Sequence, residues 1–593
     1  MNIDPHLGTL ETAGLIRVAQ LQPELEYLFH HALVQDAVYE SLLRQDRRKL
    51  HLAVGMALER AYPDRLDLLA GRLAEHFAVA GEDQRAFEYF IRAGDHAYRQ
   101  YALMEAINAY TRAIEIGARL DLSADQIRHS YLTLGRAYEL RAQYDDALAT
   151  YGELEHLAQK IGDQSLELAA VSSTATIYST FTSHYDPPKG LALSERALTL
   201  ARLLNDEPAQ AKILWNLLLG NYSVGQPAQA MEYGAQSLEI ARRLNLREQL
   251  AYTLHDYSNI VGVVTSDISG ALALKEEALA IWRELGNRAM LADGLSSIGT
   301  PLTNLGRYQE AIDNLEEALR ITEEIDNLWG QSYARMGLSF SYVIMGDSAA
   351  AIEAARQSIA LCERAGFGFP LVFCRCVIAM IDGYLGCFDL ADGELAAAKQ
   401  AVDDVLPMIA PMLQVFEIVV RAEQGDFDRV EALLETLGNA QAWDDPTADI
   451  ELCIARAMAH LNKGRPDEAI RTVDALIGKM PPEIHRTLFV CEARRVKASA
   501  MRVQGDLAGA RLELESVLRD LDETGAHFYV WEAVAELARV AEEVGNSAEA
   551  AALRARTRDE IHYLIERICD PALEASFRAR PDVSALLEEG HIV

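Results

Sequence analysis

The chain has 593 residues, of which 50% are hydrophobic, and its formal net charge at pH 7 is −34. The hydrophobic fraction excludes an intrinsically disordered chain. Because phosphate groups attract basic surfaces, the charge disfavours nucleic acids and anionic membranes as partners and favours a basic or amphipathic protein or peptide.

The first 60 residues predict a small mixed segment. Residues 16–20 alternate in polarity, a turn residue follows at Pro23, and Tyr27-Leu28-Phe29 extends the pattern, so a short β-hairpin is expected. Residues 31–43 then have helical spacing, and a further helix starts near Arg47.

A turn signature recurs every 39 to 41 residues through most of the remaining chain. A small residue, four variable residues and a second small residue make up this signature. A fixed period of this length is typical of stacked helix pairs, each unable to bury its apolar face alone. The best copies begin at Gly225, Gly306, Gly346, Gly386, Gly464, Gly505 and Gly545, and weaker ones at Ala142, Tyr185, Ser266 and Gly425.

Apolar residues at spacings of three and four flank each turn and predict two helices per repeat. We expect Gly135 and Gly299 to lie where the second helix of a pair approaches closely. Second helices end in Leu204-Asn205, Leu244-Asn245, Leu285-Gly286 and Ile325-Asp326-Asn327, where Asn and Gly tolerate the left-handed conformation that closes a helix. If each repeat contacts only its neighbours, unfolding should be less than fully cooperative.

The seven cysteines are scattered through apolar helical segments. Cys374 and Cys376 have the spacing of half a metal site, but residues two apart on a helix point in nearly opposite directions. Buried, reduced cysteines are therefore favoured, as in a cytosolic protein. No apolar run is long enough to span a membrane. We expect a cytoplasmic protein.

The repeat pattern resembles the tetratricopeptide repeat over roughly residues 70 to 560. Leu295-x-x-Ile298-Gly299-x-x-Leu302 with Ala311-x-x-x-Leu315-x-x-Ala318 is the clearest copy. The units are near 40 residues, longer than the 34 usual in that family, and lack its helix-ending Pro. The resemblance implies an all-α, right-handed superhelical solenoid. Longer units of this kind look like those of the bacterial maltose-regulon activator and related signalling ATPases.

The N-terminal segment is similar to the end of a winged helix in bacterial STAND-class ATPases, many of which carry a nucleotide cyclase domain. The resemblance rests on Gly14-Leu15-Ile16, on Tyr27-x-Phe29-x-His31-x-Leu33, and on Arg48-x-Leu50-His51. It implies four parts: a partial winged helix (1–60), linking helices and first helix pairs (61–125), tetratricopeptide-like repeats (126–560), and a capping helix and tail (561–593).

Two features of this segment have alternative interpretations. By the family resemblance His31 is a vestigial nucleotide-sensing residue, whereas on its own it is a histidine packed at a hairpin–helix junction. Arg44, Arg47, Arg48 and Lys49 form a basic run that could hold DNA or could be a solvated helix face.

The catalytic motifs of those regulators are missing from this sequence. It contains no Gly-x4-Gly-Lys-Ser/Thr phosphate loop and no recognisable cyclase aspartates. We therefore expect no enzymatic activity and no cofactor or metal. Either the chain is a non-enzymatic interaction scaffold, the sensor module of a signalling or transcription-regulatory ATPase, or it is the remainder of a cyclase or ATPase whose catalytic domains lie upstream.

The first helix of each pair lines the concave face in tetratricopeptide arrays, and that resemblance implies a partner-binding groove. Aromatic and Met side chains on such a face suit an apolar or amphipathic peptide, although several could simply pack between helices. The sequence does not fix the oligomeric state. The candidate groove residues are Trp215, Tyr222, Asp256, Ser296, Tyr333, Phe340, Phe373, Met380 and Tyr384.

Overall fold

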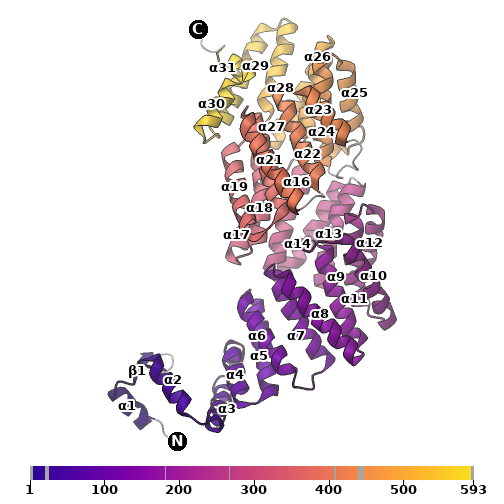
Figure 1. Ribbon diagram of the computed structural model, residues 1–593. Coiled ribbons are helices and arrows are strands. Elements are labelled where there is room, and N and C mark those ends of the chain that lie inside the picture. The colour runs from indigo at the N-terminus through magenta and orange to yellow at the C-terminus, as the bar shows by residue number, and fades with distance from the viewer. Residues whose placement is uncertain are drawn as a thin grey trace. The chain divides into compact units, whose positions relative to one another are not determined.

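The computed structural model describes residues 4–20, 26–180, 182–265, 267–405, 409–437 and 446–588. The chain divides into two compact units, residues 1–224 and 225–593, and each is described by itself. In both units the described residues are almost entirely helical (Figure 1). The predicted all-α fold is therefore confirmed.

The first unit begins with a small mixed segment. After α1 (Asp4–Thr12), the strands β1 (Ile16–Gln20) and β2 (Glu26–Phe29) pair antiparallel, with Ile16 opposite Phe29. The predicted hairpin is thus confirmed, while its expected turn at Pro23 lies outside the described residues. The helices α2 (Ala32–Ser41) and α3 (Arg44–Ala61) follow. That this segment is a partial winged helix stays a prediction.

The remainder of the first unit is a succession of helix pairs in which each helix packs on its neighbours in sequence. Side chains at the helix starts accept hydrogen bonds from free backbone N–H groups, as Ser123 and Asp163 do. The helices are α4 (Leu66–Ala80), α5 (Asp83–Arg99), α6 (Leu103–Gly117), α7 (Ala124–Leu140), α8 (Tyr144–Ile161), α9 (Gln164–Ser179), α10 (Pro187–Leu204) and α11 (Glu207–Ser223).

The second unit continues the helix pairs. Its helices are α12 (Pro227–Arg243), α13 (Arg247–Thr265), α14 (Ile268–Leu285), α15 (Arg288–Ser297), α16 (Gly299–Asn304), α17 (Tyr308–Glu324), α18 (Leu328–Ile344), α19 (Ser348–Ala365), α20 (Gly368–Tyr384), α21 (Phe388–Val405), α22 (Ala410–Gln424), α23 (Phe427–Leu437), α24 (Pro446–Asn462), α25 (Pro466–Ile477), α26 (Leu488–Val503), α27 (Leu507–Thr524), α28 (Val530–Glu543), α29 (Ser547–Ile565), α30 (Pro571–Ala579) and α31 (Pro581–Glu588).

The turn signature has the structure that its residue types predict. Every glycine that begins a copy has a positive φ, between 68° and 88°. The alanine five residues later is fully buried in each of the best copies, for example Ala311 and Ala510. Glycine adopts this conformation without strain, and alanine lets the two helices of a pair approach closely.

The turns between repeats combine two capping residues. Asn205, Asn245, Gly286 and Asp326 have positive φ and end their helices, as predicted. The following Asn327 has a different role from the one expected, because its side chain accepts a hydrogen bond from the Gly330 N–H and so begins α18.

The two glycines expected at close helix contacts differ. A Cβ added at Gly135 would lie 2.2 Å from the Tyr151 ring, so the prediction of close approach is confirmed there. At Gly299 the nearest atom, in Leu315, would be 3.4 Å away, which is an ordinary contact. The prediction was wrong at Gly299 because α16 starts at this residue, after a break in the first helix of the pair.

Repeats far apart in sequence contact each other in the second unit. The Tyr308 hydroxyl accepts a hydrogen bond from the Leu488 N–H, 180 residues away, at 2.7 Å. The Ala349 N–H donates to the Arg567 carbonyl, and the His527 N–H donates to the Ile344 carbonyl. A Cβ added at Gly386, in the turn before α21, would lie 3.3 Å from Ser576 Oγ of α30. The expectation that each repeat contacts only its neighbours is therefore wrong for this unit.

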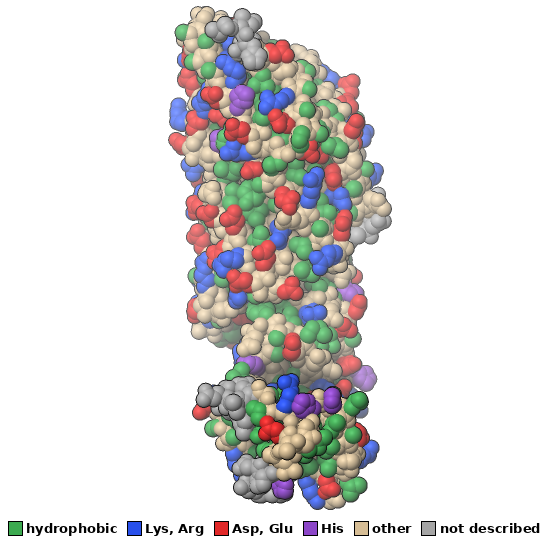
Figure 2. Space-filling view, turned by 90° about the vertical axis from the view of Figure 1, so that its left-hand side faces the viewer, with side chains coloured by type: hydrophobic (Ala, Val, Ile, Leu, Met, Phe, Trp, Pro, Cys, Tyr) green, Lys and Arg blue, Asp and Glu red, His purple; other side chains and the backbone are tan. Residues whose placement is uncertain are grey.

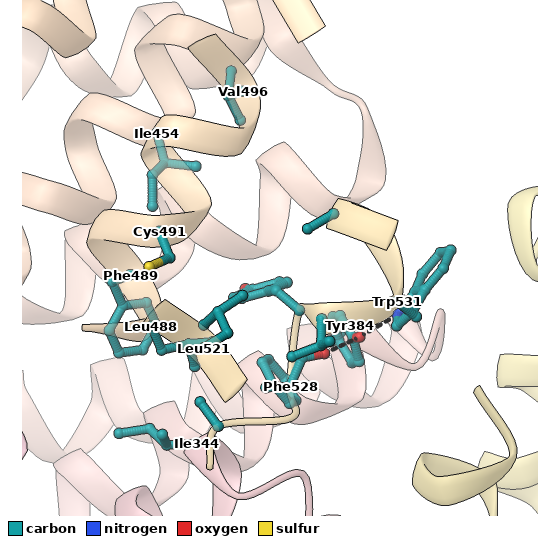
Figure 3. Close-up of a cluster of buried hydrophobic side chains, with 14 of the residues drawn as sticks. Ile344, Tyr384, Ile454, Leu488, Phe489, Cys491, Val496, Leu521, Phe528 and Trp531 are labelled. Carbon is teal, nitrogen blue, oxygen red and sulfur yellow. Dashed lines mark hydrogen bonds between the residues drawn. The ribbon is translucent and has the colours of Figure 1, made fainter. Parts of the chain in front are cut away.

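Tyr384 is at the centre of these long-range contacts. Its hydroxyl donates to the Phe528 carbonyl and accepts a hydrogen bond from Trp531 Nε1, at 2.5 and 2.7 Å (Figure 3). Its ring stacks on that of Phe528, with the centroids 4.0 Å apart. Arg580 donates to its backbone carbonyl. One large buried cluster therefore joins α18 and α20 to α26–α30.

The cysteines are mostly core residues. Cys374 and Cys376 are both fully buried and belong to different hydrophobic clusters, as expected for residues two apart on a helix. Cys569 is an exception to the prediction of buried cysteines because its side chain is exposed.

Candidate ligand-binding pocket

The second unit contains a cavity of about 240 Å³. Its walls come mainly from the first helices of five consecutive repeats: α15 with α16, α18, α20, α22 and α24. A cavity of roughly 10–15 Å³ suffices for one water molecule, so this one has room for a group of side-chain size.

A helix break shapes one wall of the cavity. Proline has no N–H and its ring clashes with the carbonyl four residues earlier, so Pro301 ends α15 at Ser297. The short α16 then continues in a new segment. Thr300, Thr303 and Asn304 on α16 line the cavity beside Ser296 of α15, and they supply hydroxyl and amide groups.

Aromatic and methionine side chains form the apolar walls. The Phe373 ring makes edge contacts with Phe340 and Phe416, with centroid distances of 6.0 and 5.8 Å. Phe340 also stacks on Phe489 of α26, at 5.8 Å. Met336, Met380 and Met412 complete this surface. The walls therefore suit an apolar or aromatic group.

Glu451 is the acidic residue of the lining. It lies on α24, and its exposed fraction is 9%. Burial, followed by the nearby carboxyl groups of Glu423 and Glu492, raises its pKa to about 8. In the part of the chain that the structure describes, no hydrogen-bond donor or cation pairs with this side chain. Glu451 was not among the residues predicted from the sequence.

Glu451 has equivalents in the next two repeats. Glu492 and Glu532 lie, like Glu451, 13 residues before the turn glycine of their own repeats. Arg495 Nη2 is 2.5 Å from Glu492 Oε1 and 3.2 Å from Glu532 Oε2, so one guanidinium serves both. A nearby carboxyl, Glu423, lies 3.7 Å from Arg580. Counting residues back from each turn glycine was the sequence signal that could have found this acidic series.

A polar cluster lies near the opposite wall. Lys275 is 3% exposed, and its Nζ is 3.2 Å from Ser297 Oγ. Burial lowers its pKa to about 8, against the raising effect of Asp256 and Asp293. Desolvation raises the pKa of Asp293 to about 6, while Lys275 opposes that shift. Burial followed by these two aspartates raises the pKa of Tyr333, which also lines the cavity, to about 12.

The structure brings five of the nine predicted groove residues together. Ser296, Tyr333, Phe340, Phe373 and Met380 all line the cavity. Asp256 belongs instead to the polar cluster around Lys275. Trp215 and Tyr222 lie on α11 of the first unit, where Trp215 is 7% exposed.

Tyr384 does not belong with these residues. It is 1% exposed and fixed between Phe528 and Trp531 in the core, so it is inaccessible to a ligand. Its partner Phe528 is 144 residues away in sequence. Local spacing does not reveal a contact over that distance. Tyr384 is therefore a core residue and not part of the candidate site.

The N-terminal candidates are exposed. His31 precedes α2 and is solvent-exposed, so the alternative of a packed junction histidine is not what the structure shows. In the basic run, Arg47 lies 3.6 Å from Glu40, and Lys49 lies 4.0 Å from Asp46. These contacts fit a solvated helix face more closely than a free cationic patch.

The surface charge is mixed. On the face shown in Figure 2, acidic and basic side chains are interspersed and do not form a patch of one sign. In the described part of the chain, no helix is long and apolar enough to cross a membrane, and no group of three or more His, Cys, Asp or Glu side chains could hold a metal ion.

Comparison with known proteins identifies the repeat. Residues 291–325 match the tetratricopeptide repeat family model. This stretch covers α15–α17, whose first helix forms the broken wall of the cavity. This stretch of the chain thus matches one tetratricopeptide repeat.

Two curated proteins resemble parts of the chain. An uncharacterized protein of Rhizobium meliloti is 28% identical over 115 residues, which are 19% of this chain and 11% of that protein. Tetratricopeptide repeat protein 29 of Trypanosoma brucei brucei is 24% identical over 221 residues, 35% of this chain and 44% of that protein. The chain therefore spans less than half the length of either relative.

Two solved structures resemble the chain at low identity. A Rap protein complexed with Competence and Sporulation Factor has a TM-score of 0.40 at 18% identity and covers 59% of this chain and 98% of its own. A STAND protein with a tetratricopeptide repeat sensor from Pyrococcus horikoshii has a TM-score of 0.43 at 16% identity. The match covers 71% of this chain and 61% of that protein's chain. We carry over no residue roles from either structure.

Proposed function

We propose that the chain is a protein-interaction module that binds a peptide, or an exposed segment of a protein, in the cavity of the second unit. The observation that supports this is the convergence of five consecutive first helices on one cavity with aromatic and methionine walls. Buried aromatic anchors of this kind dominate the affinity of many interfaces.

The cavity chemistry favours binding over catalysis. Glu451 and Tyr333 are the titratable side chains among its lining residues, and they come from different helices, α24 and α18. The other lining residues supply apolar surface, hydroxyls and an amide. Such groups orient a ligand and exclude water, but they do not activate a nucleophile.

We further propose that the module is the sensor half of a signalling or transcription-regulatory ATPase. The motif similarity of residues 14–51 to the end of a STAND-class winged helix supports this role, together with the repeats. The purified chain should then neither bind nor hydrolyse ATP. Micromolar ATP binding in calorimetry would contradict this view. An in-frame phosphate loop in the DNA upstream of Met1 would instead support the alternative, that the chain is the remainder of an ATPase or cyclase.

The binding role is tested by selecting a random peptide library on the full chain. Thr300 is exposed and lines the cavity, so Thr300→Trp should fill the space with little effect on the core. Thr436→Trp, at an exposed site on α23, is the matched control. We expect enriched peptides to bind the wild type and the control but not Thr300→Trp. Equal binding by all three would place the binding surface elsewhere.

Tyr333→Ala combined with Phe340→Ala should also abolish capture of the selected peptides. Because Phe340 packs on Phe373 and Phe489, this variant carries a folding cost that Thr300→Trp avoids. Its helical content must therefore be measured by circular dichroism before its binding is interpreted.

A further inference from the structure

Glu451 differs from its two repeat equivalents in its lack of a cationic partner among the described residues. Glu492 and Glu532 share Arg495, whereas Glu451 has no donor or cation among the described residues. A buried carboxyl group without such a partner loses its hydration and gains nothing in return. A positively charged group supplied by a ligand could compensate for that loss.

The surroundings of Glu451 also contain more carboxyl groups than cations. The carboxyl groups of Glu423 on α22 and Glu492 on α26 lie near it, and Glu532 on α28 lies near both of these. Two guanidinium groups, of Arg495 and Arg580, face this set of carboxyl groups. Carboxylates therefore outnumber cations in this part of the core. A ligand cation at Glu451 would reduce that imbalance without moving any element.

The position of Glu451 restricts where such a cation can enter. Glu451 lines the cavity, whereas Glu492 and Glu532 do not. Aromatic and methionine side chains, including Phe373 and Met412, form the apolar part of the remaining walls. The site thus combines an aromatic and thioether surface with one unpaired carboxyl group. This is the complement of an apolar group that carries a positive charge.

We propose, resting on the function proposed above, that the cavity selects ligands in which a basic side chain stands beside an aromatic or aliphatic one, and that Glu451 is the residue that recognises the basic group. The carboxylate accepts hydrogen bonds from the guanidinium or ammonium group, while the Phe373 and Phe416 faces contact the apolar neighbour. The occupant is a basic, amphipathic peptide segment.

Proton release should accompany binding. With its pKa at about 8, Glu451 holds a proton in much of the empty protein at neutral pH, and an arriving cation displaces it. The groups that face Glu451 are Glu423 from α22, Glu492 from α26 and Tyr529 just before α28. The affinity for a guanidinium-containing peptide should therefore rise close to tenfold from pH 6 to 7 and level off above about pH 8.

The test is a parallel selection of one random heptapeptide library on three full-length proteins: the wild type, Glu451→Gln and Glu532→Gln. Glu532→Gln changes the equivalent residue of another repeat, outside the cavity lining. We expect Arg or Lys next to aromatic or aliphatic residues among wild-type and Glu532→Gln binders, and no basic enrichment with Glu451→Gln. Melting curves of the three proteins verify folding.

A peptide selected on the wild type is then synthesised together with an analogue in which Arg is replaced by citrulline or Lys by norleucine. The affinities of both peptides are measured for the wild type and for Glu451→Gln. Loss of the ligand charge should weaken binding to the wild type at least tenfold, and to Glu451→Gln by less than threefold. Basic enrichment that survives Glu451→Gln would overturn the inference, and so would a pH-independent affinity. Neutral apolar binders alone would overturn it too, while leaving the binding role intact. If no peptide is enriched by the wild type, the proposed function itself fails.

Discussion

The two units are built from the same helix pairs but differ in the range of their contacts. In the first unit, bonds such as that from Asn216 Nδ2 to the Ser172 carbonyl link adjacent repeats, 44 residues apart. In the second unit, Tyr308, Tyr384 and Tyr563 make hydrogen bonds over 144 to 218 residues, about four to five repeats. The same helix pairs therefore form contacts between adjacent repeats in the first unit and contacts between distant repeats in the second.

This difference bears on function because the cavity belongs to the unit with long-range contacts. Phe489 of α26 stacks on Phe340, and the Leu488 N–H is bonded to Tyr308. The cavity walls are therefore supported by a helix that comes 150 residues or so later in the chain. A binding site held in this way is pre-organised, and less of the binding free energy is spent on ordering it.

The largest expected effect comes from breaking a long-range contact. Tyr384→Ala removes a buried ring and two hydrogen bonds and should cost about 3–5 kcal/mol. Hydrogen exchange should increase both in α20 and in α28–α30. Tyr110→Ala is the matched change in the first unit, because Tyr110 is fully buried and bonded to Asp95, only 15 residues away.

We expect Tyr110→Ala to increase exchange only in α5, α6 and α7. The comparison between units is contradicted if both variants affect just their own and adjacent repeats, or if each unfolds its whole unit.

One titrating group in each unit should contribute to stability with an opposite pH dependence. Burial, followed by Glu423 and Glu492, raises the pKa of Glu451 from 4.5 to about 8. Its contribution to stability is fully present below pH 4.5 and is lost as the pH rises to about 8. In the first unit, hydrogen bonds from His129 and Tyr110 overcome the opposing effect of burial and lower the pKa of Asp95. That contribution is present above pH 3.8 and is lost as the pH falls.

Glu451→Gln should therefore stabilise the second unit by about 1–3 kcal/mol at pH 8 and have little effect at pH 4.5. Urea unfolding monitored by hydrogen exchange in each unit measures this. A stabilisation of equal size at both pH values would show that the carboxyl group is not desolvated.

The sequence predicted what depends on local spacing. Gly306 and Ala311 occupy the conformations that their turn requires, and Tyr333, Phe340 and Phe373 fall on the inner side of the first helices and line the cavity. Periodicity identifies these positions because each side chain direction is fixed within one helix pair.

What the sequence could not give is the packing of one repeat on another four or five repeats away. Tyr384 has the spacing of a groove residue, but Phe528 covers it. Glu451 was missed for a different reason. Its distance of 13 residues from the turn glycine places it in the series with Glu492 and Glu532. The sequence does not show, however, that Glu492 and Glu532 pair with Arg495 whereas Glu451 has no cationic partner among the described residues.

A smaller effect is expected where helix packing is local. Gly135→Ala would place a Cβ 2.2 Å from the Tyr151 ring and should cost about 1–3 kcal/mol in the first unit. Gly299→Ala in the second unit meets Leu315 at 3.4 Å and should be neutral or stabilising by about 0.5–1 kcal/mol. Denaturation midpoints of the two variants measure the difference. Equal destabilisation by both would mean that the pairing assigned around Gly299 is incorrect.

The smallest effect concerns a feature that the units share. Asn205 in the first unit and Asn245 in the second both end a helix with φ of 52°. Alanine adopts this left-handed conformation less readily, so Asn205→Ala and Asn245→Ala should each cost about 1 kcal/mol. Because the strain lies within one residue, the cost should be the same in both units and should leave the hydrogen exchange of distant repeats unchanged. A clearly larger cost for Asn245→Ala, with exchange rising as far away as α28, would show that even the turns of the second unit are coupled to its long-range core.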